Sequence, residues 1–237
     1  MTTPDRDIRV AVSTVIVALR RHPETGELAL AMPLVRRVAE PFEGSWALPG
    51  GWVGVDEGLE ESAATRLFET TRVQPRYLEQ LYAFGDVDRS PDRVVSIVYW
   101  ALVRGDETPG VPDDWNVRWF FAEHLPRLAF DHDRIVDYAL WRLRNKVGYS
   151  RIAQAFLGDR FTLAELRSVH EAILGRRLDP ANFRRQVAQS DAIVATDELS
   201  SGGRHRPARL YRSNPLLAFA DNGPLGSDRP PAPPTGT

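Results

Sequence analysis

Long apolar segments dominate the first half of the chain and predict the strands of a sheet. Residues 10–19 (VAVSTVIVAL) are rich in β-branched side chains, and residues 27–34 form a second apolar run. The polar segment between them contains Pro and Gly, which is typical of a hairpin loop. Further strand-like segments lie at residues 77–84, 93–103 and 115–121.

Helical periodicity interrupts this strand pattern twice. In residues 58–71, Leu59, Ala63 and Leu67 recur on one side of a helix, and residues 131–147 carry a second apolar stripe. We therefore expect the front of the chain to fold as an α+β or α/β domain. The pattern leaves the order of its strands open.

The pattern changes after residue 147. Short amphipathic segments predict three helices, and two strand-like segments then enclose a Gly-rich turn. The expected helices span residues 150–157, 162–174 and 179–189, and the expected strands span residues 192–196 and 207–211.

Local signals bound the second and third of these helices. Thr162 and Glu165 have the spacing of a capping box, and Gly175 is well placed to end the same helix. Asp179 and Pro180 then supply an N-cap and a first-turn proline. A capped helix, a short turn, a further helix and two strands are the parts of a winged helix-turn-helix.

Composition narrows the class of protein. The 237 residues include no cysteine, which excludes disulfides, zinc–thiolate sites and thiol catalysis. No run of about 18 apolar residues occurs, so no membrane span is expected. The first residues lack the basic and apolar regions of a secretory signal, and we expect a cytoplasmic protein.

Charge is distributed unevenly along the chain. Residues 148–213 hold eleven arginines and seven acidic residues, a net charge of +4, whereas residues 1–147 hold eighteen basic and twenty-three acidic residues, a net charge of −5. The division predicts a front domain (1–147) whose last helix, about 131–147, is a connector, followed by a basic domain (148–213). Residues 214–237 are rich in Pro and Gly and are expected to be a disordered tail.

The segment from Leu48 to Val73 resembles the Nudix box, and this resemblance implies an α/β/α sandwich for the front α+β domain. Gly51 and Glu57 stand at the spacing of that motif, and Leu67, Glu69 and Val73 match it as well. The departures fall where the catalytic residues of the motif reside, and they are Thr65, Arg66, Thr70 and Arg72.

These departures remove the expected metal ligands. Nudix hydrolysis needs hard divalent cations held by carboxylate oxygens, and positions 66, 69 and 70 of one helix face converge. Only Glu69 is acidic among them, and Arg66 puts a positive charge beside it. Two unit charges about 4 Å apart interact by about 4 kcal/mol at an effective dielectric near 20. We expect no metal site, no catalytic residue and no enzyme activity.

A pocket without metal can still bind a nucleotide. Arginines can offer guanidinium forks to a pyrophosphate, glycines allow its close approach to the backbone, and Phe42, Trp46 or Trp52 can stack on a base. The candidate effector-binding residues are Arg36, Arg37, Phe42, Trp46, Gly50, Gly51, Glu57, Arg66 and Glu69. The alternative is that the arginines lie on the surface and that the aromatic rings only pack.

The helix at 179–189 is the candidate reader of DNA. Phe183 and Val187 lie four apart and are expected to face inward, which leaves polar residues on the other faces. Arginine reads guanine in the major groove, and Asn or Gln reads adenine, while arginines of a wing contact phosphates or the minor groove. The candidate DNA-binding residues are Thr162, Asn182, Arg184, Arg185, Gln186, Arg204, His205, Arg206 and Arg209. The alternative is a small helical protein-interaction domain with a solvated charged face.

Further motifs resemble one particular family. The chain to about residue 213 is similar to the NrtR group of Nudix-related transcriptional regulators. The resemblance is carried by residues 79–82 (EQLY), 128–132 (LAFDH), 161–163 (FTL), 182–185 (NFRR) and 206–212 (RPARLYR).

This resemblance implies a repressor of genes for NAD biosynthesis or salvage. It implies ADP-ribose or a related NAD metabolite as effector, no required cofactor, and a homodimer on a palindromic double-stranded operator. Two other functions remain open, an active Nudix hydrolase of ADP-ribose-type substrates with an accessory domain, and a DNA-binding protein whose Nudix part is only a dimerisation scaffold.

Overall fold

The computed structural model describes residues 7–72, 75, 77–105, 116–147, 151–200 and 207–214. The tail beyond residue 214 lies outside this part of the chain. The strands of the front domain are β1 (Arg9–Arg21), β2 (Leu28–Arg36), β3 (Trp46–Ala47), β4 (Gly50–Trp52), β5 (Tyr77–Phe84), β6 (Val94–Val103) and β7 (Val117–Phe121). Its helices are α1 (Leu59–Thr71), the 3₁₀ helix η2 (Ala122–His124) and α2 (His132–Val147).

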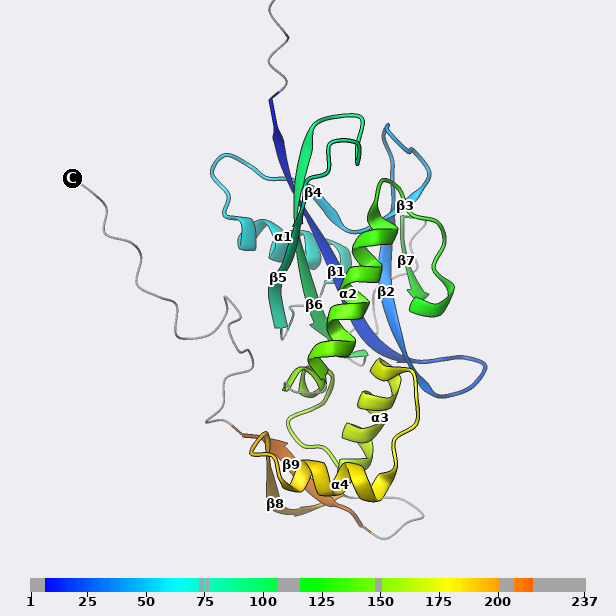
Figure 1. The fold of residues 1–237 in the computed structure, drawn as a ribbon, viewed down its shortest axis with the longest axis vertical. Coiled ribbons are helices and arrows are strands. Elements are labelled where there is room, and N and C mark those ends of the chain that lie inside the picture. The colour runs from blue at the N-terminus through cyan, green and yellow to red at the C-terminus, as the bar shows by residue number, and fades with distance from the viewer. Residues whose placement is uncertain are drawn as a thin grey trace, which may run out of the picture.

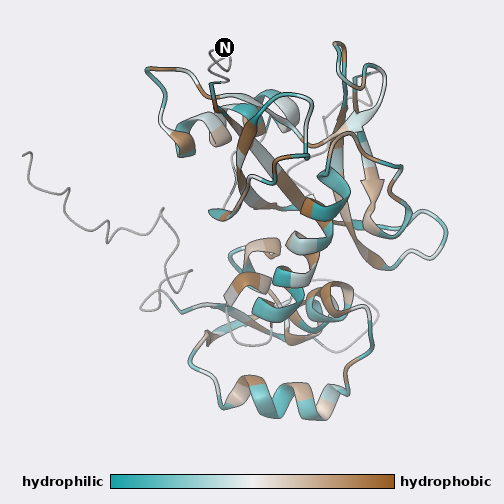
Figure 2. Cartoon of the chain, turned by 45° about the horizontal axis from the view of Figure 1, so that its top comes forward, coloured by the Kyte–Doolittle hydropathy of each residue, from teal (hydrophilic) through white to brown (hydrophobic). Residues whose placement is uncertain are grey.

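A mixed sheet forms the centre of the front domain. Its order is β3-β2-β1-β6-β5, with β4 paired to β1 and β7 paired to β2 (Figure 1). β1 and β6 are parallel, and the other pairs are antiparallel. Residues 12–19 of β1 are buried, as expected of a β-branched strand with neighbours on both faces. Figure 2 shows these central strands as the apolar part of the domain.

Helices cover both faces of the sheet. Ala63 and Leu67 of α1 pack in one apolar cluster with Ile16 and Tyr99, while Ile135 and Leu143 of α2 belong to the cluster on the opposite face. Figure 1 shows α2 crossing the front of the sheet with α1 behind it. The expected α/β/α sandwich is confirmed, and the parallel β1–β6 pair is the part that periodicity alone did not reveal.

The second domain has the elements of a winged helix. It contains the 3₁₀ helix η3 (Arg151–Phe156), α3 (Leu163–Leu174), α4 (Pro180–Ala188), β8 (Ile193–Leu199) and β9 (Arg209–Ser213). β8 and β9 form a two-stranded antiparallel sheet, and Phe161 bridges to Tyr211 beside it. β8 continues three residues past the predicted strand, across an irregularity in its pairing between Ala195 and Leu199.

One apolar core runs through both domains. Leu143 and Val147 of α2 belong to the same buried cluster as Ile152 of η3 and as Val169 and Ile173 of α3. The helix expected to connect two domains therefore packs with both of them, and the buried core continues across the predicted boundary near residue 147.

The C-terminal end of α2 is anchored to the sheet by Lys146, the only lysine of the chain. Its Nζ donates to Glu79 Oε2 over 2.6 Å and to the Tyr77 hydroxyl over 3.1 Å. Both charged side chains are about 10% exposed. No helix in the described part of the chain has the length and apolar character needed to cross a membrane.

Candidate effector and DNA-binding sites

Close packing against β1 fixes the loop that contains Gly50 and Gly51. The Thr14 amide donates to the Pro49 carbonyl over 2.8 Å, and Gly50 and Gly51 pair with Ser13 and Val12. A Cβ atom at Gly50 would stand 2.3 Å from the Val12 carbonyl oxygen, so only glycine fits there. The Pro-Gly-Gly sequence is thus explained by this contact between two strands.

Arg66 lies over Gly51 and binds the remaining carboxylate of the box. A Cβ atom at Gly51 would be 3.0 Å from Arg66 Nε, and Arg66 Nη1 donates to Glu69 Oε2 over 2.9 Å. The Thr70 hydroxyl donates back to the Arg66 carbonyl over 2.8 Å. Gly51, Arg66 and Glu69 are therefore brought together. The described residues contain no group of three or more His, Cys, Asp or Glu arranged to hold a metal ion.

One donor in this arrangement has no acceptor. The Nε atom of Arg66 is buried and makes no hydrogen bond in the described structure. Buried donors are normally paired, because leaving one unpaired costs about 1–3 kcal/mol. The Nε of Arg66 is therefore a polar group that the protein itself leaves unsatisfied in the described structure.

Glu57 lies in the loop before α1. Its Oε2 accepts from the Gly54 amide over 3.3 Å and closes the turn that leads into the helix. Arg72, which replaces the glycine of the box, ends the helix in the left-handed conformation at φ 58°. This is the conformation that glycine adopts most readily, so the helix end keeps the form of the motif without its usual residue.

The other predicted effector residues form a second group around the loop between β2 and β3. Arg36 Nε donates to the Gly44 carbonyl over 3.1 Å, and Arg37 Nε donates to the Pro41 carbonyl over 2.7 Å. The Arg37 guanidinium also lies 4.7 Å from the centre of the Phe130 ring. Burial lowers the pKa of Arg37. Both arginines thus use part of their hydrogen-bonding capacity to hold the loop.

Aromatic rings flank the same loop. Phe42 is 45% exposed and touches Phe130 edge-on, whereas Trp46 packs against Phe120 and is half-buried. Trp52 is also 45% exposed and is covered by the Arg9 guanidinium at 3.6 Å. Among these rings, Phe42 and Trp52 are the more exposed, and Trp52 carries the Arg9 guanidinium on its ring.

His132 joins the two groups, and the sequence analysis did not select it as a site residue. Its Nδ1 accepts from the Leu48 amide over 3.0 Å, in the loop between Trp46 and Gly50. The ring is 7% exposed, and burial lowers its pKa to about 4. The Ala129 amide donates to the Trp46 carbonyl over 2.8 Å beside it. The first turn of α2 therefore holds the loop of the candidate effector site.

A buried ion pair fixes the same end of α2. Arg89 donates to both carboxylate oxygens of Asp131, over 2.6 and 3.0 Å, and to the Ser96 hydroxyl over 2.8 Å. Such bidentate pairs combine strength with fixed geometry. The start of α2 is consequently held by two sets of contacts, His132 with the Leu48 amide and Asp131 with Arg89.

The helix caps of the second domain form as the sequence predicts. The Glu165 amide donates to Thr162 Oγ1 over 3.1 Å, and the Thr162 amide donates to Glu165 Oε2 over 2.7 Å. Asp179 accepts from the Asn182 amide over 2.7 Å at the start of α4. Thr162 thus serves as the cap of α3. Its contact with DNA stays a prediction.

α4 presents its polar residues to solvent. Phe183 is buried against His170, with ring centres 5.2 Å apart, and burial lowers the pKa of His170 to about 4. Arg185 Nη2 donates to Asn182 Oδ1 over 2.7 Å, so these two side chains act as a unit. The exposed residues of the helix include Asn182, Arg184, Arg185 and Gln186.

The wing is described only in part. Arg209 begins β9 and is exposed. Arg204, His205 and Arg206 lie outside the described residues, and their DNA contacts remain predictions.

Two family models match the chain. The model described as the NUDIX domain matches residues 10–139, and that of the NrtR DNA-binding winged helix domain matches residues 153–213. The first range runs from β1 into α2, and the second runs from η3 to the end of β9.

Similar proteins include repressors that match along most of the chain. The chain is 34% identical over 189 residues to the ADPR responsive transcriptional repressor NtrR of Acinetobacter baylyi, a match that covers 77% of this chain and 75% of that protein. The crystal structure of Shewanella oneidensis NrtR has a TM-score of 0.75 at 34% identity and covers 87% of this chain and 94% of its own. Its complex with a 27mer DNA has a TM-score of 0.72 at 35% identity, with the same coverage.

The chain is also similar, over a shorter length, to an enzyme. The chain is 37% identical over 111 residues to the ADP-ribose pyrophosphatase of Methanocaldococcus jannaschii, which covers 46% of this chain and 66% of that protein. The similarity thus covers 77% of the chain for the NtrR repressor and 46% for the pyrophosphatase.

Proposed function

Since the chain belongs to the NrtR family of Nudix-related transcriptional repressors, we propose that it represses genes of NAD biosynthesis or salvage in response to an NAD metabolite such as ADP-ribose. The observation that carries the proposal is Arg66, which lies over Gly51, binds Glu69 and keeps a buried Nε without an acceptor. A charged donor stands where a hydrolase would hold its metal.

The effector would bind through its phosphates and its base. A pyrophosphate oxygen would satisfy Arg66 Nε, and charge-assisted hydrogen bonds of this kind are the stronger ones. The exposed face of Phe42 offers stacking to an adenine ring. The NtrR relative is named as ADPR responsive, which favours ADP-ribose over other NAD metabolites.

The connector helix α2 would carry the signal. His132, in the first turn of α2, accepts a hydrogen bond from the Leu48 amide. The last turns of α2 share an apolar core with η3 and α3. An effector that displaces the loop around Leu48 would shift α2 and, with it, α4. The size of the response would equal the difference in effector affinity between the two conformations.

The winged helix would bind an operator through α4. In a homodimer, two α4 helices would face successive major grooves of a palindromic site, and this protein would act in the cytoplasm with its DNA. Arg184, Arg185 and Asn182 are exposed on that helix and have the chemistry to read guanine and adenine.

The test is a gel shift on the gene's own upstream region, titrated with ADP-ribose, NAD and nicotinamide mononucleotide. ADP-ribose is expected to release the operator from the wild type. The Arg66→Ala variant should bind the operator without responding to ADP-ribose, and the Arg185→Ala variant should bind ADP-ribose normally but bind the operator more weakly. Unchanged operator affinity with all three metabolites would contradict the gating.

We further propose that the protein does not turn over ADP-ribose. Glu69 is the only acidic residue among positions 66, 69 and 70, and it is paired with Arg66. Incubation with Mg²⁺ and ADP-ribose should yield no AMP above the uncatalysed rate. Steady AMP formation that disappears in the Glu69→Gln variant would establish hydrolysis instead.

A further inference from the structure

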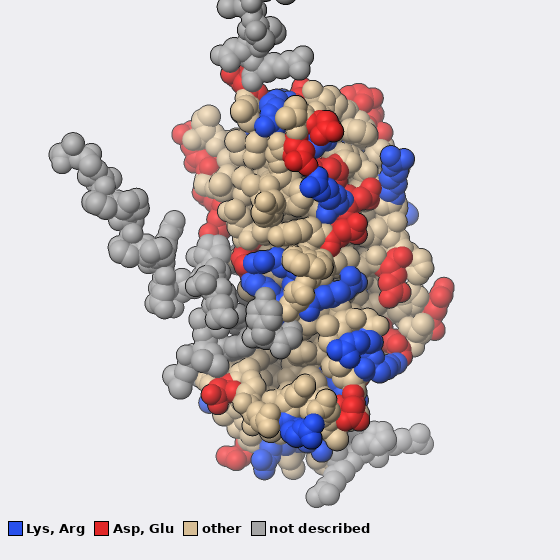
Figure 3. Space-filling view, in the orientation of Figure 1, with Lys and Arg blue, Asp and Glu red and all other residues tan. Residues whose placement is uncertain are grey.

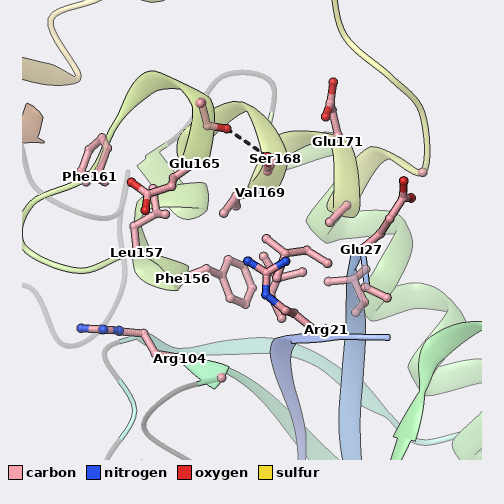
Figure 4. A pocket seen from close by; sticks show the side chains of 18 of the residues that line it. Arg21, Glu27, Arg104, Phe156, Leu157, Phe161, Glu165, Ser168, Val169 and Glu171 are labelled. Atoms are coloured by element: carbon pink, nitrogen blue, oxygen red, sulfur yellow. Dashed lines mark hydrogen bonds between the residues drawn. The ribbon is translucent and has the colours of Figure 1, made fainter. Parts of the chain in front are cut away.

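A cavity of about 910 Å³ lies between the two domains, away from the Nudix box. The front domain contributes Arg21 and Glu27 from the β1–β2 hairpin and Arg104 from the end of β6, and the second domain contributes Phe156 and Ser168 (Figure 4). Its volume lies within the range of about 300–1,000 Å³ that small-molecule sites occupy. Gly50, Gly51, Arg66 and Glu69 are not among its lining residues.

Arginines dominate the charge of this cavity. Its lining contains six arginines and four glutamates. Three of the glutamates already have partners, because Glu27 pairs with Arg177, Glu165 accepts from Thr162, and Glu171 accepts from the Leu178 amide. Figure 3 shows basic side chains gathered at mid-height, where the domains meet. The arginines are Arg21, Arg104, Arg144, Arg160, Arg176 and Arg177.

Several of these arginines have donors to spare. Arg21 donates Nη1 to the Gly26 carbonyl over 3.0 Å, its one side-chain hydrogen bond in the described structure, and Figure 4 shows its guanidinium inside the cavity near Phe156. Arg144 and Arg176 are exposed and make no side-chain hydrogen bond or ion pair with another described residue. Guanidinium forks of this kind suit phosphate oxygens.

The apolar side chains that line the cavity also limit the kind of ligand that fits it. Phe156 and Leu157 are each 8% exposed, and they line the cavity together with Leu28 and Leu30. A ring or an acyl group would fit against these side chains, whereas an inorganic ion would leave them uncovered. α4 lies at the far end of the second domain, with α3 between it and the hairpin (Figure 1). Operator DNA on α4 would therefore leave this cavity free.

We propose that this cavity is a second ligand site, which binds an organic polyphosphate of nucleotide size. The phosphates would lie on Arg21 and Arg144, and the ring would lie on Phe156. A ligand that touches both domains favours the arrangement that brings them together. The Glu27–Arg177 ion pair already joins the hairpin to the turn between α3 and α4, so occupancy would stabilise the placement of α4.

The test is calorimetric titration of the full chain with ATP and, as a probe without a ring, inorganic tripolyphosphate. We expect saturable ATP binding that weakens about tenfold in Arg21→Gln and in Arg144→Gln, the loss of one charge-assisted hydrogen bond. Arg127→Gln removes the same charge from an exposed position outside the cavity and should leave the affinity unchanged. Tripolyphosphate should bind more weakly than ATP.

Hydrogen exchange locates the site independently. ATP should protect backbone amides of residues 21–28 and 156–168. The proposal is wrong if ATP does not bind, if Arg127→Gln weakens binding as much as Arg21→Gln, or if only Arg66→Ala abolishes it, which would place ATP in the Nudix box. It is also wrong if Arg21→Gln and Arg144→Gln weaken operator binding without ligand, because the arginines would then serve DNA. These measurements need neither ADP-ribose nor its effect on DNA, so their failure is distinct from failure of the proposed repressor function.

Discussion

At the scale of single residues, Arg66 stands at a position where the Nudix box has a metal-binding carboxylate, and substitution can test whether that explains why the described residues hold no metal-binding cluster. Its guanidinium neutralises Glu69, and Thr70 offers a hydroxyl where a second carboxylate would stand. We expect the double variant Arg66→Glu and Thr70→Glu to bind Mn²⁺ with a Kd on the order of 1 mM or tighter, since three carboxylates would converge on one helix face. Calorimetry with Mn²⁺ checks this, and the wild type, with Glu69 alone, is the control. Equal Mn²⁺ affinity in both proteins would refute the explanation.

His132 makes the stability of the fold depend on pH. Burial is the main cause that lowers its pKa from 6.5 to about 4, Arg89 and Arg37 add to the shift, and Asp131 opposes it. His132 therefore binds a proton below about pH 6.5 in the unfolded chain but only below about pH 4 in the folded protein. Stability is complete above pH 6.5 and falls as the pH approaches 4.

The expected loss is about 2 kcal/mol of unfolding free energy from this group between pH 7 and pH 4.5. Urea unfolding at the two pH values measures it. The His132→Asn variant, which cannot take up the proton, should lose correspondingly less between these pH values. The same slope in the variant and in the wild type would show that other groups carry the dependence.

Sequence reasoning succeeded at this scale where the partners are close in the chain. Thr162 and Glu165 are three residues apart, and Asp179 and Asn182 have the same separation. Leu48 and His132 are separated by 84 positions, and spacing carries no information across such a distance. The contact of His132 became visible only in the structure, where Trp46 also pairs with Leu128 and Ala129 just before α2.

At the scale of elements, α2 links the candidate effector loop to the winged helix. Replacing His132 by leucine removes the acceptor for the Leu48 amide, whereas asparagine keeps an oxygen acceptor of similar reach. We expect the ratio of operator Kd with and without ADP-ribose to fall about tenfold in His132→Leu, within the usual range of coupling energies. His132→Asn should keep most of the ratio. A full response in His132→Leu would remove this contact from the signal path.

α4 and the wing should differ in how they affect DNA binding. Arg185→Ala is expected to cost about 1–3 kcal/mol of operator affinity and to relax base preference, because Arg185 would read a base. Arg209→Ala should weaken all sequences alike and reduce the salt slope by about 1, because Arg209 would contact a phosphate. Gel shifts at several salt concentrations on operator and scrambled DNA separate the two effects. Identical behaviour of the two variants would contradict the assignment of α4 as the reader.

Periodicity predicted which elements exist but not how they pair. Helices α1, α3 and α4 lie close to the expected ranges because their apolar stripes and caps are local. The parallel β1–β6 pair joins strands whose first residues, Arg9 and Val94, are far apart in the chain. No turn signal connects them, so the order of the sheet was not accessible from the sequence.

At the scale of the whole molecule, the continuous core joins a Nudix domain and a winged helix domain that differ in charge. The front carries −5 and the basic segment +4, yet Leu143 and Val147 pack with residues of both domains. We expect a single calorimetric unfolding transition, because neither domain can lose this core alone. A fragment ending at residue 147 should melt at a lower temperature, since it exposes the apolar side of α2. Two separate transitions in the full chain would contradict a shared core.

The burial of Lys146 has a practical consequence for labelling. Its Nζ is held by Glu79 and Tyr77, and no other lysine occurs in the chain. Amine-reactive dyes and crosslinkers should therefore modify the folded protein at the α-amino group and leave the side-chain amine unmodified. A fluorophore could thus be attached at one defined point without engineering, while uptake of a second dye per chain would report the moment at which α2 separates from the sheet.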